Sequence, residues 1–123
     1  MKNNAILVVD DEPDITMTLK MGLQAYGFKV SIFNDPVLAL SNVKPGLYDL
    51  ALLDIRMPKM SGFELYKEIE KIDNKVKVCF ITAFEVYYES LRELYPDSKV
   101  SCFIKKPVLI EKLVDHIKKE LGG

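Results

Sequence analysis

The sequence predicts an α/β domain in which helices cover both faces of a parallel sheet. Short β-rich apolar runs alternate along the chain with longer segments whose apolar residues recur at helical spacing. The run at 50–53 is apolar without interruption, which is typical of a strand buried on both faces. The 123 residues fit one domain, so we expect 1–123 to fold as a single unit.

The first half of the chain contains two predicted strand–helix units and a third strand. The strands are expected at 5–9, 29–33 and 50–54. Pro13 and the pair Asp35-Pro36 fit the starts of the two helices, because proline needs no N–H in a first turn. The inner helical faces are assigned to Ile15, Leu19, Leu23 and Tyr26, and to Val37, Leu40 and Val43.

The second half repeats this alternation. Strands are expected at 76–82 and 100–104, and 85–95 has the composition of a helix. Five strands alternating with five helices predict a three-layer (βα)5 domain with right-handed crossovers. In the flavodoxin-like order 2-1-3-4-5, the first and third strands flank the switch point where ligands bind. The remaining helical faces comprise Phe63, Tyr66, Ile69 and Ile72, and Ile110, Leu113, Val114, Ile117 and Leu121.

The charge balance and the cysteines exclude some classes of protein. Lys and Arg number 17 and Asp and Glu 18, so we expect no nucleic-acid binding by this domain itself. No apolar segment approaches the roughly 20 residues of a membrane span, and no signal peptide is recognisable. Cys79 and Cys102 lie in apolar runs without metal-ligand spacing. We expect both to be reduced core thiols of a cytoplasmic protein.

Polar side chains collect at the carboxyl ends of four predicted strands. Asp10 and Asp11 follow the first strand, Asp54 ends the third, Thr82 ends the fourth and Lys106 follows the fifth. The strand order places them around one pocket, where three carboxylates would repel one another. An all-oxygen site favours Mg²⁺. The metal, the lysine, the hydroxyl and a carboxylate nucleophile are the parts of a phosphoryl-transfer site, with Asp54 as the acceptor.

Four motifs together resemble the receiver domain of two-component response regulators, which has a CheY-like fold. They are Val-Val-Asp-Asp-Glu at 8–12, Leu-Leu-Asp-Ile-Arg-Met-Pro at 52–58 with Gly62, Ile-Thr-Ala at 81–83 and Lys-Lys-Pro at 105–107. The resemblance covers essentially the whole chain. It implies a phosphorylation-activated signalling switch, not a turnover enzyme, that assists its own phosphorylation and its slow hydrolysis.

The resemblance implies a role for each acidic residue. Asp54 would be the phosphoacceptor. Asp11 and Asp54 would bind Mg²⁺ directly, together with the backbone carbonyl of Arg56, and Asp10 would help through water. The phosphoryl donor would be a phosphohistidine on a sensor histidine kinase or a histidine phosphotransfer protein.

It also implies how the switch would work. Lys106 would pair with the phosphoryl oxygens, and its bond to Pro107 is usually cis in this family. Thr82, with Ala83 beside it, would bind one of these oxygens after transfer. Phe103 would turn inward as Thr82 moves. The face built by the fourth helix, the fifth strand and the fifth helix would then change for an unknown output partner.

Two positions depart from the family pattern. Val108 stands where receivers usually have Phe, and Phe84 is bulky beside the pocket. We hypothesise that Phe84 and Arg56 modulate access to the pocket, with Phe84 shielding the aspartyl phosphate from water. The lone histidine, His116, is expected to be solvated.

Two other classes remain as alternatives. A small Mg²⁺-dependent phosphatase or phosphotransferase acting on metabolites usually carries an Asp-x-Asp motif, but Asp54-Ile55-Arg56 lacks the second aspartate. A nucleotide-binding domain would need a Gly-rich loop after a strand, which is not found. The chain could be a stand-alone regulator, a relay intermediate or the receiver of a longer protein. It could be a monomer or a phosphorylation-dependent dimer.

Overall fold

The sheet has the predicted strand order. The structure, a computed structural model, describes residues 4–83, 93, 100 and 102–122. All strand pairs are parallel, in the order β2-β1-β3-β4-β5. The strands are β1 (Ala5–Val9), β2 (Lys29–Phe33), β3 (Leu50–Asp54), β4 (Lys77–Thr82) and β5 (Cys102–Lys105).

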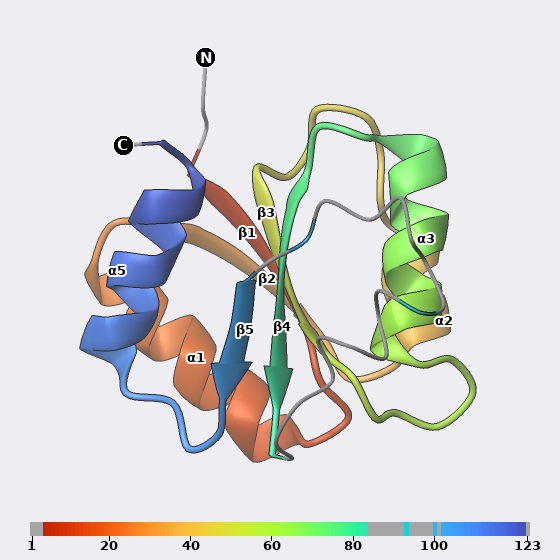
Figure 1. The fold of residues 1–123 in the computed structure, drawn as a ribbon. Helices are drawn as coiled ribbons and strands as arrows, with labels where there is room; N and C mark the ends of the chain where they lie inside the picture. The colour runs from red at the N-terminus through yellow and green to blue at the C-terminus, as the bar shows by residue number, and fades with distance from the viewer. Residues whose placement is uncertain (1–3, 84–92, 94–99, 101, 123) are drawn as a thin grey trace.

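Helices cover both faces of this sheet, so the domain has three layers. In Figure 1, α1 and α5 lie on one face, and α2 and α3 lie on the other. The described helices are α1 (Pro13–Ala25), α2 (Pro36–Ser41), α3 (Gly62–Ile72) and α5 (Ile110–Glu120). The helix predicted at 85–95 lies outside the described residues, apart from Glu93.

Each face of the sheet has its own apolar core, because successive strand residues point to opposite faces. Ile6 and Val8 of β1 pack in the core beneath α1 and α5, whereas Leu7 and Val9 pack in the core beneath α2 and α3. Every residue of β3 is buried, as the uninterrupted apolar run predicted. The sheet therefore fixes the position of Asp54, which ends β3.

Two helical faces differ from the prediction. Val37 is 49% exposed, while Pro36 and Ala39 are buried. Leu40 and Val43 pack against the core as predicted, so the prediction is wrong at Val37 alone, in the first turn of the 6-residue helix α2. Tyr26 is 48% exposed because α1 ends at Ala25 and Tyr26 forms its C-cap.

The prediction of two reduced thiols is wrong for this structure, in which a disulfide joins Cys79 and Cys102. The two residues are register partners on the neighbouring strands β4 and β5, with Cα atoms 4.6 Å apart. Their sequence separation of 23 hides this proximity, which depends on where β5 pairs with β4. The bond ties the edge strand β5 to the interior of the sheet.

Candidate functional site

The predicted acidic pocket lies at the carboxyl edge of the sheet. Val9 of β1 and Leu53 of β3 are register partners, so Asp10 and Asp54 follow side by side. Both carboxylates are buried, with residue exposures of 2% for Asp10 and 7% for Asp54. Asp11 is half-buried.

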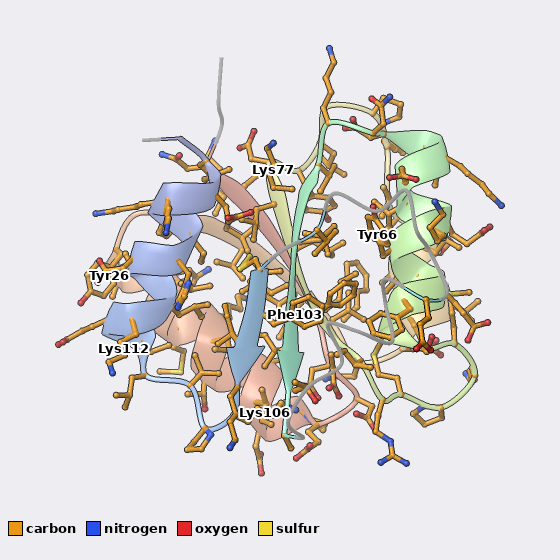
Figure 2. All side chains as sticks on the ribbon, viewed as in Figure 1. Tyr26, Tyr66, Lys77, Phe103, Lys106 and Lys112 are labelled. Atoms are coloured by element: carbon orange, nitrogen blue, oxygen red, sulfur yellow. A yellow bond between two sulfur atoms is a disulfide. The ribbon has the colours of Figure 1, made fainter. Side chains whose placement is uncertain are left out.

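Lys106 reaches this pocket from beyond β5. Figure 2 shows it beside the arrowheads of β4 and β5, at the edge where the parallel strands end. Its ammonium lies 2.8 Å from Oδ2 of Asp10, 3.6 Å from Oε1 of Glu12 and 3.7 Å from Oδ1 of Asp54. The lysine side chain is 12% exposed, so these ion pairs form largely away from water. Lys106 therefore neutralises part of the acidic cluster.

The surroundings of Asp54 and Lys106 shift the pKa values of both residues. The pKa of Asp54 is raised from 3.8 to about 6, mainly by burial and also by the charges of Asp10 and Asp11, against an opposing effect of Lys106. Burial lowers the pKa of Lys106, but its close ion pair with Asp10 and the negative charge of Asp54 outweigh burial and raise the pKa overall. The carboxylate of Asp54 is thus held close to other negative charges at an energetic cost.

The donor set of this pocket fits a hard divalent cation. Carboxylate oxygens of Asp10, Asp11 and Glu12 lie within 4.8 Å of one another. Oδ2 of Asp10 is buried and accepts no well-directed hydrogen bond from the described residues, although the ammonium of Lys106 is close to it. Oxygen-rich sites that retain room for water are the kind that Mg²⁺ prefers.

Glu12 is a member of this cluster that the sequence prediction left out. It forms the N-cap of α1, and its exposed side chain approaches Lys106. The signal was present, since Glu12 extends the acidic run Asp10-Asp11. The residue type alone could not tell an acid that faces the pocket from one that only begins a helix.

The loop after β3 is built so that α3 begins close to the phosphoacceptor candidate. Ser61 and Glu64 form a capping box at the start of α3. The N–H of Gly62 donates to the carbonyl of Ile55 at 2.8 Å. A Cβ on Gly62 would overlap the backbone carbonyl of Asp54, so only glycine fits this approach. Lys59 of the same loop pairs with Asp35 at 2.7 Å, the N-cap of α2.

Of the other predicted site residues, Thr82 is buried, whereas Ala83 and Arg56 lie at the surface. Thr82 ends β4 and is buried, and its carbonyl accepts a 2.7 Å hydrogen bond from the N–H of Lys106. Ala83 and Arg56 are exposed. The peptide bond before Pro107 is cis, as the resemblance implied.

Phe103 is partly buried, and its ring centroid lies 5.4 Å from that of Phe80 in the core beneath α3. Figure 2 shows its ring near the middle of the sheet, away from Lys106. Phe84 lies outside the described residues. His116 is exposed, as predicted.

These features define a class of protein: a doubly wound α/β domain with an acidic cluster and a partly buried lysine at the carboxyl ends of its strands. The family model "Response regulator receiver domain" matches residues 6–118. The chain therefore belongs to the receiver-domain family of response regulators.

Individual proteins are similar to this chain over nearly its whole length. The transcriptional regulatory protein YkoG of Bacillus subtilis (strain 168) is 31% identical over 121 residues, which cover 98% of this chain and 52% of that protein. A CheY-like receiver domain protein from Methanospirillum hungatei JF-1 has a crystal structure that matches with a TM-score of 0.85 and 30% identity, covering 96% of this chain and 93% of that one. The response regulator TrrA of Thermotoga maritima, solved in complex with Mg(2+)-BeF, matches with a TM-score of 0.78 and 34% identity, covering 98% and 99%.

The chain spans about half the length of curated relatives that it matches, such as YkoG. In the part of the chain that the structure describes, no helix is both long and apolar enough to cross a bilayer.

Proposed function

We propose that this domain is a phosphorylation-activated signalling switch in which Asp54 accepts a phosphoryl group. The donor is a phosphohistidine on a sensor histidine kinase or a histidine phosphotransfer protein. A carboxylate oxygen of Asp54 forms a bond to phosphorus as the phosphorus–nitrogen bond breaks, and the imidazole leaves with the electron pair. The observation that supports this best is the position of the Lys106 ammonium between Asp10 and Asp54, 2.8 and 3.7 Å from their carboxylate oxygens.

Mg²⁺ is the cofactor of this reaction, and it neutralises charge on the phosphoryl oxygens when bound. Asp11, Asp54 and the backbone carbonyl of Arg56 would hold it, with Asp10 acting through water. The closeness of Glu12 to this cluster makes it a further contributor of negative charge. Crowded carboxylates and a buried oxygen without a directed hydrogen bond support this assignment.

Lys106 and Thr82 respond to the new charge. A phosphoryl group adds about −1.5 to −2 charges at neutral pH. Lys106 pairs with its oxygens, and the hydroxyl of Thr82 donates to one of them next to the backbone of Ala83. Because the N–H of Lys106 donates a hydrogen bond to the carbonyl of Thr82, the backbone segments that carry these two residues move together.

The consequence is a changed surface for an output partner. Phe103 follows Thr82 inward, which alters the surface to which β5 and α5 contribute; the helix predicted at 85–95 lies outside the described residues. The ring of Phe103 already packs against Phe80, so the ring would move from one position in the core to another. Reversing such an equilibrium almost completely takes about 5.5 kcal/mol of differential stabilisation, which a few charge-assisted bonds supply.

Labelling with acetyl phosphate and Mg²⁺ tests the proposal. We expect near-stoichiometric, acid-stable and base-labile labelling that Asp54→Ala abolishes, whereas Asp115→Ala, which removes an exposed carboxylate of α5, retains it. Labelling of Asp54→Ala at the wild-type level would refute the proposal. Turnover of many equivalents of a phosphorylated metabolite would favour a phosphatase instead.

The proposed shielding by Phe84 is tested separately. Phe84→Asn should lose the phosphoryl group several times faster than the wild type if the ring excludes water. An unchanged rate of phosphate loss would remove this role from Phe84 and leave the switch itself in place.

A further inference from the structure

The side-chain amide of Asn34 joins two parts of the acidic loop between β1 and α1. Asn34 directly follows β2 and so stands at the same edge of the sheet as the pocket. Its Nδ2 donates to the backbone carbonyl of Asp10 at 2.8 Å and to the hydroxyl of Thr16 at 2.9 Å. These contacts connect the end of β1 to the first turns of α1.

The donors and acceptors of this network match one another. The amide nitrogen carries two hydrogens, and it has two acceptors. The hydroxyl of the buried Thr16 donates to the carbonyl of Pro13 at 3.1 Å, which leaves its oxygen to accept from Asn34. A flipped amide would set an oxygen against the carbonyl oxygen of Asp10, so the network itself selects this orientation.

The end of β2 holds both the N–H and the carbonyl of Asp10. The N–H of Asp10 donates to the carbonyl of Phe33 at 3.2 Å, and its carbonyl accepts from Asn34. Oδ1 of Asp10 accepts from the N–H of Glu12 at 2.9 Å, and Oδ2 is directed to Lys106. Fixing the backbone of Asp10 therefore also fixes the direction in which its carboxylate presents the second oxygen.

The loop depends on this support because its helix has a weak start. The N-cap of α1 is Glu12, whose side chain makes no capping hydrogen bond within the described structure. The bonds from Asn34 to Asp10 and Thr16 span this start from outside the helix. Asn34 is itself exposed, so its contribution lies in these two bonds and not in filling the core.

We propose that Asn34 is a positioning residue for the metal-binding acids. It preorganises the loop that carries Asp10 and Asp11, and so increases the affinity of the domain for Mg²⁺. This inference rests on the function proposed above. Residues that orient metal ligands typically change metal affinity by about 10- to 100-fold when mutated. Asn34 acts through a backbone carbonyl, so we expect the lower end of this range, about tenfold.

Titration of the unphosphorylated protein with Mg²⁺ by calorimetry tests the proposal. Asn34→Ala should raise the dissociation constant about tenfold. Asn42→Ala is the matched control, because it removes an exposed amide whose bonds to the Leu38 carbonyl and the Ser41 hydroxyl stay within the end of α2. Thr16→Val keeps the bond to Asp10 and should weaken binding less than Asn34→Ala does. A larger effect of Thr16→Val would overturn the assignment to the Asn34–Asp10 contact.

Two readouts separate positioning from a general loss of stability. Asn34→Ala should raise the Mg²⁺ concentration that gives half the maximal rate of labelling by acetyl phosphate, while the rate at saturating Mg²⁺ stays at the wild-type value. In the absence of metal, the amide of Glu12 should exchange its hydrogen roughly tenfold faster, because its acceptor on Asp10 is no longer held.

The possible failures are distinguishable. If the wild type binds Mg²⁺ and Asn34→Ala binds it equally well, the positioning role is refuted and the switch proposal stands. If the wild type binds no Mg²⁺ and Asp54 is not labelled, both proposals fail. Equal urea midpoints for Asn34→Ala and Asn42→Ala are expected, and a metal effect that merely follows a large loss of stability would also refute positioning.

Discussion

Replacing Asp54 with asparagine should stabilise the metal-free domain at neutral pH, although it removes the residue on which the proposed function depends. Asparagine has nearly the same shape as aspartate but carries no charge. The carboxylate of Asp54 is buried beside Asp10 and Asp11, and its pKa is raised from 3.8 to about 6. The folded protein therefore holds this carboxylate in its charged form at a cost, which Asp54→Asn removes.

The shift gives the size of the effect. About 2 pKa units at about 1.4 kcal/mol each correspond to about 3 kcal/mol. Part of the carboxylate remains in contact with water, so we reduce this to about 2 kcal/mol. Because the folded state binds the proton more tightly than the unfolded state, the wild type loses this stability as the pH rises from about 4 to about 6. At about pH 3 the group is protonated in both states, and the variant should gain nothing from the lost charge.

Urea unfolding followed by circular dichroism, with a chelator present, measures the difference. We expect the free energy of unfolding of Asp54→Asn to exceed that of the wild type by about 2 kcal/mol at pH 7.5. This gain should shrink as the pH falls from about 6 to about 4. Asp115→Asn, on the exposed face of α5, is the control for removing a carboxylate. Mg²⁺ should stabilise the wild type more than Asp54→Asn, because the ion relieves the same repulsion. A variant no more stable than the wild type at pH 7.5 would contradict the reasoning.

Three further substitutions probe the surroundings of the pocket. Gly62→Ala should cost about 2 kcal/mol in urea unfolding and slow labelling by acetyl phosphate, because its Cβ would displace the backbone at the end of β3; wild-type values for both would refute the close approach. Lys106→Met should destabilise the metal-free protein by about 2 kcal/mol at pH 7.5, because it leaves the buried carboxylate of Asp10 unpaired. Calorimetry should show that the variant binds Mg²⁺ more tightly than the wild type. Weaker Mg²⁺ binding would contradict the proposal that Lys106 neutralises the acidic cluster. Reduction should lower the stability of the oxidised protein by about 3 kcal/mol through loss of the loop closed by Cys79 and Cys102, whereas the double alanine variant should not respond to reductant.

The sequence predicted the elements that a single strong pattern specifies. The unbroken run at 50–53 gave β3 and the position of Asp54 at its end, and the structure confirms both. Strand β5 was less well predicted, at 100–104 instead of Cys102–Lys105. An edge strand pairs on one side only, so its limits depend on its partner more than on its own composition. For the same reason, only the register of β4 and β5 shows that Cys79 and Cys102 lie side by side.

Asp10, Asp54 and Lys106 were predictable because one rule finds them: polar residues at or directly after the ends of buried strands meet at one edge of a parallel sheet. Glu12 lies further from its strand, and the rule missed it. The same rule applied to β2 would have singled out Asn34 and Asp35, which follow a strand that is only partly buried. It could not have shown that Asn34 donates to the backbone carbonyl of Asp10, just after β1, or that Asp35 pairs with Lys59. Those contacts depend on how far each loop extends over the sheet edge, which no spacing in the sequence encodes.

The pocket combines a rigid acceptor with more weakly held partners, and this difference suits a switch. Asp54 is the last residue of a strand that is buried throughout, so its position follows from core packing. Lys106 and the acidic loop are instead held by a few polar bonds, among them those from Lys106 to the Thr82 carbonyl and from Asn34 to the Asp10 carbonyl. Each such bond contributes only about 1 kcal/mol net, whereas a buried core element resists displacement by several times that. A charge added at Asp54 would therefore move the lysine and the loops while the acceptor stays in place.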